Sequence, residues 1–103
     1  MQIRNFAGGP IEILWIGFDG NLVPQTEKSI KPNNEANINS YNTHKFQIRF
    51  ENGKPHSQVV VFTKGPYEEV ITVFNEDNVL SIDQVSKYDE FQDTVSDATR
   101  RLP

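Results

Sequence analysis

The sequence predicts an all-β fold, a small antiparallel β-sandwich of about seven strands followed by one C-terminal α-helix. Short apolar segments alternate with turn residues from Gln2 to about Phe74, at the spacing typical of sandwiches and barrels. The 103 residues suit one small domain with a single core. After Asn78 the apolar residues recur every three or four positions, which is typical of a helix.

Turn chemistry separates the predicted strands. Asp19-Gly20 and Asn52-Gly53 are dipeptides that accept the positive φ of tight hairpins, and Gly8-Gly9-Pro10 and Lys64-Gly65-Pro66 also interrupt the pattern. The strands are expected near Gln2–Phe6, Ile11–Phe18, Leu22–Val23, Asn37–Ser40, Lys45–Phe50, Gln58–Phe62 and Glu69–Phe74.

Two strands differ in the burial that their patterns predict. In Lys45–Phe50 every second residue is apolar, which is typical of a strand with one buried face. Ile11–Phe18 is apolar on both faces, with Ile13 and Trp15 on one and Ile16 and Phe18 on the other. We therefore expect it to be a central strand covered on both sides.

The last 25 residues, 79–103, are expected to form an acidic amphipathic helix or a linker outside a β domain of residues 1–78. Ser81 to Gln84 resemble a capping box, which places the helix at about Ile82–Arg101. Its apolar stripe consists of Tyr88, Phe91, Val95, Ala98 and Leu102. The helix either packs on the domain or docks on a partner, since such a stripe is normally buried.

Composition argues against several classes of function. Between Glu68 and Asp97 nine acidic residues face one basic residue, Lys87, so this half should repel nucleic acid. The absence of cysteine excludes disulfides and thiolate metal sites. With no apolar run near the ~20 residues that span a bilayer, no signal-peptide core and no Asn-x-Ser/Thr acceptor, we expect a cytoplasmic or nuclear protein without membrane contact.

The residues alone support no catalytic or metal site. Ser40 and His44 could form a nucleophile and its base, but no orienting carboxylate or oxyanion hole accompanies them. His44 and His56 match no metal-ligand spacing. Trp15 is most simply a core residue, and Tyr41 could lie in the core, in a pocket wall or on the surface. We therefore expect no enzymatic activity, cofactor or metal.

Two stretches together resemble the β domain of the von Hippel-Lindau tumour suppressor family. The first, ILWIGFDGNLVPQ, is a tryptophan strand that runs into a Phe-Asp-Gly turn. The second, INSYNTHKFQIRF, begins at Ile38 and has an Ile-x-Ser-Tyr-x-x-His-x-aromatic pattern. The resemblance covers about Gln2–Phe74 and implies a small antiparallel sandwich that binds an extended peptide containing hydroxyproline.

The resemblance also implies a ligand site. By position, Ser40 and His44 would hold the hydroxyl of hydroxyproline, and Trp15 would form the floor of the pocket. Phe46 stands where the family has a second tryptophan, and Tyr41 would line the path of the peptide. A buried Ser–His pair can reject plain proline, because the pair stays unsatisfied when the hydroxyl is missing.

This chain departs from the family in three places. The family's pocket uses a tyrosine soon after the Asp-Gly turn, where this chain has Gln25–Glu27, and Thr43 stands where the family often has glycine. The cysteine-containing helical box that recruits a ubiquitin-ligase adaptor is missing. The favoured interpretation is a non-catalytic module that binds a proline- or hydroxyproline-containing peptide. The alternative is a structural or targeting accessory domain of a larger protein, for example one that carries a prolyl hydroxylase.

Overall fold

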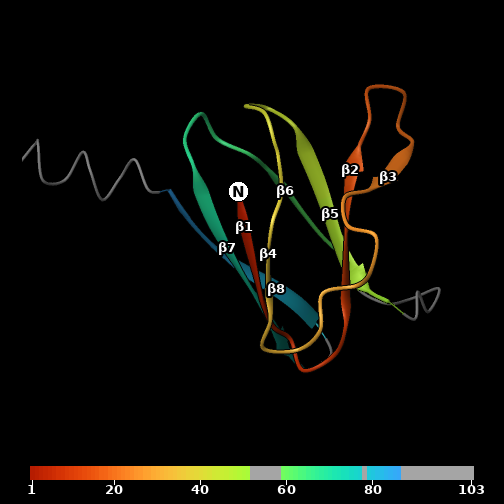
Figure 1. The fold of residues 1–103 in the computed structure, drawn as a ribbon, viewed down its shortest axis with the longest axis vertical. Coiled ribbons are helices and arrows are strands. Elements are labelled where there is room, and N and C mark those ends of the chain that lie inside the picture. The colour runs from red at the N-terminus through yellow and green to blue at the C-terminus, as the bar shows by residue number, and fades with distance from the viewer. Residues whose placement is uncertain (52–58, 78, 87–103) are drawn as a thin grey trace, which may run out of the picture.

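Two four-stranded sheets make up the described part of the chain, as Figure 1 shows. The structure is a computed structural model, and it describes residues 1–51, 59–77 and 79–86. The first sheet has the strand order β4-β1-β7-β8 and the second the order β3-β2-β5-β6. The strands are β1 (Gln2–Phe6), β2 (Ile11–Ile16), β3 (Leu22–Pro24), β4 (Glu35–Asn37), β5 (Lys45–Phe50), β6 (Val60–Thr63), β7 (Glu69–Glu76) and β8 (Val79–Ser86).

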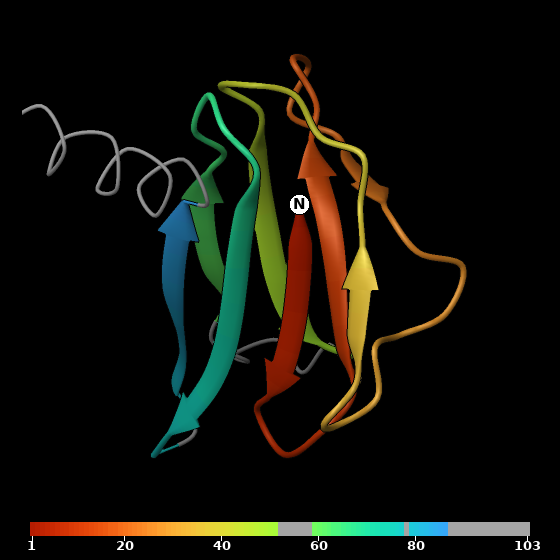
Figure 2. The ribbon, with the colours of Figure 1, turned by 60° about the vertical axis from the view of Figure 1, so that its left-hand side comes forward.

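Both sheets contribute to one hydrophobic core. Alternate residues of β2, β5 and β7 belong to this cluster, as the period of two in a strand requires, and β1 contributes Ile3. Figure 2 shows the two sheets with these strands side by side in each. The fully buried aliphatic residues of the core are Ile3, Ile11, Ile13, Ile48, Ile71 and Val73.

The predicted bounds of β1 and β5 are confirmed, and so is the all-β class. In β5, Phe46 and Ile48 are buried while Lys45 is exposed, as the alternation predicts. The prediction that Ile11–Phe18 forms a central strand covered on both faces holds only in part. Leu14 is buried on the face away from the core cluster, but the strand ends at Ile16 and Phe18 lies outside it.

The prediction of a purely antiparallel arrangement is wrong for one pair of strands. β1 and β7 run parallel, with Ile3 opposite Ile71 and Phe6 opposite Phe74. Parallel neighbours need a long crossover connection, and the chain between β1 and β7 supplies one. All other strand pairs in the two sheets are antiparallel.

The predicted start of the C-terminal helix is also wrong. Ile82–Ser86, expected as helix, belong to β8, which pairs with β7 along all eight of its residues. The capping-box pattern from Ser81 to Gln84 is therefore part of a strand, in which Leu80 is buried and Val79 exposed. Asp77 closes the β7–β8 hairpin with a φ of 53°, a conformation that aspartate tolerates. The remaining residues of the expected helix, 87–103, lie outside the described residues.

β4 lies earlier in the chain than predicted. Its pairing with β1 ends at Gln2 opposite Asn37, so Ser40 lies in the connection to β5 instead of in a strand.

The connection before β4 is held by Asn5, which is fully buried. The Asn5 side chain donates to the carbonyl oxygens of Gly9 and Ile30, both at 2.8 Å, and accepts from the Ala7 amide at 2.8 Å. No helix among the described residues is long and apolar enough to cross a membrane.

Candidate functional site

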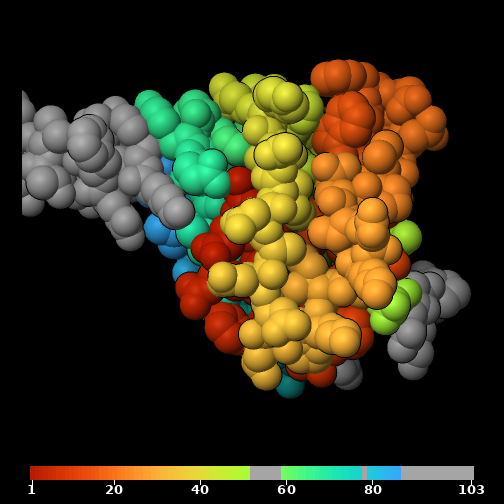
Figure 3. Space-filling view, in the orientation of Figure 1, coloured from red at the N-terminus to blue at the C-terminus, as the bar shows by residue number. Residues whose placement is uncertain are grey.

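Three connections gather at one end of the two sheets. They are the β2–β3 turn, the β4–β5 connection and the β6–β7 connection, and Figures 1 and 2 both show them at the end opposite the β7–β8 hairpin. Figure 3 shows the chain after β4 running between the β6–β7 connection on one side and the β2–β3 hairpin on the other. Trp15, Ser40, Tyr41 and His44 belong to this end of the molecule.

Trp15 is held by its neighbours in the second sheet. It lies next to the last residue of β2, opposite Val23 of β3 and Phe46 of β5. Residues directly opposite one another point to the same face of a sheet, so the three side chains lie in one row. Trp15 is partly buried against the core, which leaves part of its indole accessible.

The backbone of the β4–β5 connection is fixed at both ends. At its start, the Ile38 amide donates to the Met1 carbonyl at 2.8 Å. At its end, the His44 amide donates to the Tyr41 carbonyl at 3.1 Å, which closes a four-residue turn. The Thr43 amide donates to the Lys64 carbonyl at 3.0 Å, and the Lys64 amide donates to the His44 carbonyl at 2.9 Å. The position of His44 is therefore tied to the β6–β7 connection.

The turn before His44 places Thr43 in a conformation that favours glycine. Thr43 is the third residue of the turn and has a φ of 72°, in the left-handed region. This is the position where such turns favour glycine, because a Cβ is strained there. Thr43 therefore adopts a conformation that glycine would adopt more easily.

Four rings form an aromatic cluster, which we define as Trp15, Phe18, Tyr41 and His44. The His44 imidazole stacks on Trp15, with ring centroids 5.1 Å apart and planes inclined by 29°. Phe18 meets His44 edge to face at 5.8 Å and Trp15 at 5.7 Å. Tyr41 meets His44 at 5.3 Å with planes inclined by 65°. His44 thus lies at the centre of the cluster and contacts all three other rings.

The outer rings of the cluster face solvent. Phe18 is 92% exposed and Tyr41 is 70% exposed, although both have large apolar surfaces. Sequence reasoning found Trp15, Tyr41 and His44 but not Phe18, which it treated as a strand residue. The signal for Phe18 was its place directly before Asp19-Gly20, since a residue beside a hairpin turn is normally not buried.

Ser40 and Phe46 are placed differently from the cluster. Ser40 Oγ is inaccessible to solvent and has no hydrogen-bond partner among the described residues. Phe46 is 1% exposed and stacks on Phe62 at 5.6 Å, inside the core. Phe46 therefore supports Trp15 from the neighbouring strand and lies beneath the surface that a ligand could touch.

The hydrogen-bonding capacity of Ser40 and His44 is unused. Within the described part of the chain, Ser40 Oγ has no hydrogen-bond partner, and His44 makes hydrogen bonds only through its backbone. The two side chains share no hydrogen bond with one another there. A buried hydroxyl without a partner is destabilising by about 1–3 kcal/mol, so such a group is a candidate for binding a ligand or an ordered water.

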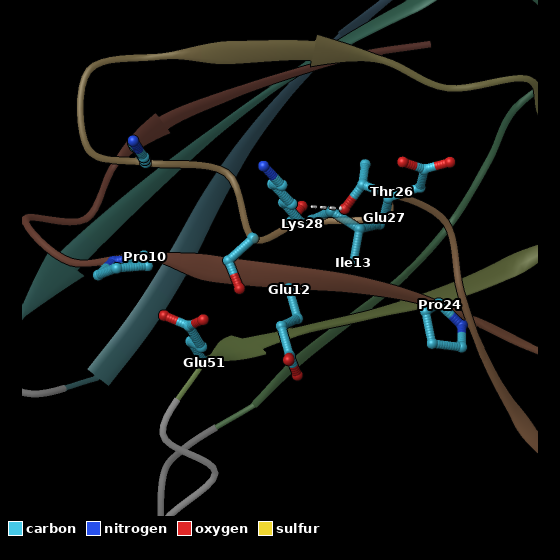
Figure 4. Close-up of a pocket in the computed structure, with 10 residues that line it drawn as sticks. Pro10, Glu12, Ile13, Pro24, Thr26, Glu27, Lys28 and Glu51 are labelled. Atoms are coloured by element: carbon cyan, nitrogen blue, oxygen red, sulfur yellow. Dashed lines mark hydrogen bonds between the residues drawn. The ribbon is translucent and has the colours of Figure 1, made fainter.

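Two surface hollows are lined by residues outside the aromatic cluster. A hollow of about 470 Å³ next to Ser40 is lined by Met1, Gln25, Asn37, Ile38, Asn39 and Glu68. Another, of about 460 Å³, lies between β2 and the chain after β3, where Figure 4 shows Thr26, Glu27 and Lys28 together. In this second hollow Thr26 Oγ1 donates to the Lys28 carbonyl at 2.6 Å, and Glu12 accepts from Arg49 at 2.8 Å. Neither hollow is lined by Trp15 or His44.

No group of three or more His, Cys, Asp or Glu side chains comes together among residues 1–51, 59–77 and 79–86 in a way that could hold a metal ion. His56 lies outside the described residues. Comparisons with protein-family models, with curated proteins and with solved structures found no match.

Proposed function

We propose that this chain is a non-catalytic interaction module that binds an extended, proline-containing peptide, preferably one that carries hydroxyproline. The observation that supports the proposal is the aromatic cluster, in which a partly buried Trp15 and His44 lie beside the exposed rings of Phe18 and Tyr41. Aromatic surfaces of this kind are the usual docking sites for proline-rich segments.

Proline suits the cluster for two physical reasons. Its ring presents a flat apolar face that packs on an aromatic ring. A proline-containing segment is also already extended in solution, so binding costs it little conformational entropy. The accessible parts of Trp15, Phe18 and Tyr41 offer apolar surface for such a ring.

The preference for a hydroxyl group is based on Ser40 and His44. Both lie in the β4–β5 connection, and neither side chain has a hydrogen-bond partner among the described residues. Because Ser40 Oγ is buried, the side chain must turn about its Cα–Cβ bond to reach a ligand hydroxyl. Ser40 Oγ would then gain a hydrogen-bond partner from hydroxyproline but not from proline, which favours binding of the hydroxylated peptide.

Binding without catalysis is the simpler function for these residues. A serine nucleophile needs a hydrogen bond to its base, and in the described part of the chain Ser40 and His44 share none.

We further infer that the two sheets are the layers of a β-sandwich like that of the von Hippel-Lindau β domain. The core shared by both sheets supports this inference.

A second candidate is favoured by one observation. The inaccessibility of Ser40 Oγ suits a structural or targeting accessory domain, in which Ser40 and Phe46 only support the fold. In that case the aromatic cluster would serve a function other than peptide binding. The two candidates predict different results in the following titration.

The test uses pairs of short peptides that are identical except for proline or hydroxyproline. Trp15 is the only tryptophan, so its fluorescence reports directly on the cluster. We expect both peptides to change the emission and the hydroxylated one to bind more tightly. Ser40→Ala should reduce the difference in binding free energy between the two peptides by about 1–3 kcal/mol.

Ser86→Ala is the matched control, because Ser86 Oγ is also buried without a partner but lies in β8. This variant should keep the discrimination of the wild type. No change in emission with either peptide would reject peptide binding and leave the accessory-domain function. Binding of both peptides with equal affinity would reject only the proposed preference for hydroxyproline over proline.

A further inference from the structure

We infer that the β2–β3 hairpin carries a second subsite, formed by Phe18 and Val23, which accepts a large apolar side chain next to the proline of the ligand. The inference rests on the proposed function, because it extends the aromatic cluster that would bind the proline. The subsite would select the ligand residue that stands next to the proline. It also gives a role to Phe18, whose side chain does not belong to the core.

The turn that carries Phe18 is stabilised by other groups. The Gly17 amide donates to the Asn21 carbonyl at 2.8 Å, and the Gly20 amide donates to the Gly17 carbonyl at 2.9 Å. Asp19 accepts from the Asn21 amide at 3.0 Å and from its side chain at 2.7 Å. Gly20 supplies the positive φ of 84° that the turn requires. The Phe18 side chain contributes to none of these interactions.

The fold also gains little from burying Phe18. Its side chain is 92% exposed and lies outside the core cluster, so almost all of its apolar surface is in contact with water. Burial of such a surface is favourable by roughly 25 cal/mol per Å². A binding partner that covered the ring would obtain this free energy, whereas the isolated domain does not.

Val23 extends the same surface on the other side of the hairpin. It lies directly opposite Trp15 in the β2–β3 pair and is 41% exposed. Because opposite residues of an antiparallel pair point to the same face, Val23 and Trp15 present adjacent side chains. Phe18 contacts Trp15 edge to face at 5.7 Å. Trp15 therefore connects the proposed proline site to an apolar surface with Phe18 and Val23 at its margin.

The chemistry of the hairpin favours an apolar ligand residue over a charged one. Asp19 is the acidic residue of the turn, and both of its carboxylate oxygens already accept hydrogen bonds from Asn21. A charged ligand side chain that covered Phe18 and Val23 would lose hydration, and these two apolar side chains offer it no hydrogen bond in return. An aromatic or branched aliphatic side chain needs no polar partner and can cover Phe18 and Val23, so we expect leucine or phenylalanine beside the proline.

A double-mutant cycle tests the inference. The probes are short hydroxyproline peptides whose neighbouring residue, before or after the hydroxyproline, is phenylalanine, leucine, alanine or lysine. We expect the phenylalanine and leucine peptides to bind the wild type about tenfold or more tightly than the alanine peptide. Phe18→Ala should lose most of this preference, and the measured quantity is the ratio of the two affinities, because Phe18 also borders the proposed proline site and its loss weakens the binding of every peptide. The two changes should therefore be strongly non-additive.

Phe74→Ala is the control for loss of an exposed aromatic side chain. Phe74 is 38% exposed and lies at the end of β7 next to the β7–β8 hairpin, away from the cluster. It should keep the preference for a large neighbour. The melting temperature of Phe18→Ala should stay within about 3 °C of the wild type, because the ring is not in the core.

The outcomes separate this inference from the proposed function. If no hydroxyproline peptide binds the wild type, the proposed function fails and the subsite fails with it. If the peptides bind but the neighbouring residue has no effect, or its effect is unchanged in Phe18→Ala, only the subsite is rejected. A preference for the lysine peptide would likewise reject an apolar subsite.

Discussion

At the scale of single residues, the candidate site depends on a few backbone and side-chain positions that do not stabilise the fold. Thr43 occupies the left-handed region, Ser40 Oγ is buried without a partner, and Phe18 exposes almost its whole ring. The first two features destabilise the isolated domain, and the third contributes almost nothing to its stability. All three lie in the two connections that form the aromatic cluster, and unfavourable positions of this kind concentrate at functional sites.

Thr43→Gly should stabilise the protein. A left-handed conformation costs a residue other than glycine about 1–2 kcal/mol, and the greater freedom of glycine in the unfolded chain offsets about 0.5–1 kcal/mol of that relief. We therefore expect a gain of about 0.5–1 kcal/mol in the free energy of unfolding, measured by urea denaturation. Asn33→Gly is the matched control. Asn33 has a φ of 65°, but asparagine tolerates this conformation, so its gain should be smaller. A loss of stability in Thr43→Gly would contradict the assignment of strain at this turn.

At the scale of elements, β8 shows why a pattern of a few residues can mislead. VLSIDQVS contains both a period of two and the spacing of a capping box. Its pairing with β7 places Leu80 and Ile82 beside Asn75 and Val73, so the strand buries apolar surface that a helix starting at Ile82 would leave unpaired. Long-range pairing therefore overrides the local helix signal.

Substitutions in two adjacent residues test this assignment of β8. Leu80 is 4% exposed and Val79 is 43% exposed, as neighbours in a strand with one buried face should be. Leu80→Ala should lower the free energy of unfolding by about 2–4 kcal/mol, because it leaves a cavity in the core. Val79→Ala should lower it by less than about 1 kcal/mol. Similar effects of the two changes, measured by chemical denaturation, would show that these residues do not alternate across a sheet.

At the scale of the whole molecule, the two sheets are joined through one core and through side-chain contacts. Gln84 of β8 donates to the Thr63 carbonyl of β6 at 3.1 Å and to the carboxylate of Glu69 at 2.7 Å. The backbone of Lys64 pairs with Thr43 and His44, so the β6–β7 connection also holds the candidate site. The geometry of the site is therefore a property of the entire fold.

We expect the two sheets to unfold together. Trp15 fluorescence reports on the second sheet and far-ultraviolet circular dichroism on both, and a shared core predicts coincident transitions. Gln84→Ala should shift both transitions by the same amount and lower the free energy of unfolding by about 1 kcal/mol. Separate midpoints for the two signals would mean that the sheets are not one cooperative unit.

The sequence by itself determined the all-β class and the bounds of β1 and β5. These features depend on local chemistry, namely alternation within a strand and turn residues at its ends. Trp15, Tyr41 and His44 were singled out by the resemblance to a family, and their packing into one cluster was decided by the tertiary structure. The parallel pairing of β1 with β7, the strand at 79–86 and the burial of Phe46 and Ser40 Oγ were decided by the tertiary structure. The packing of Phe18 on Trp15 and His44 was decided there as well. Each of these depends on contacts between residues far apart in the chain, which a local pattern does not encode.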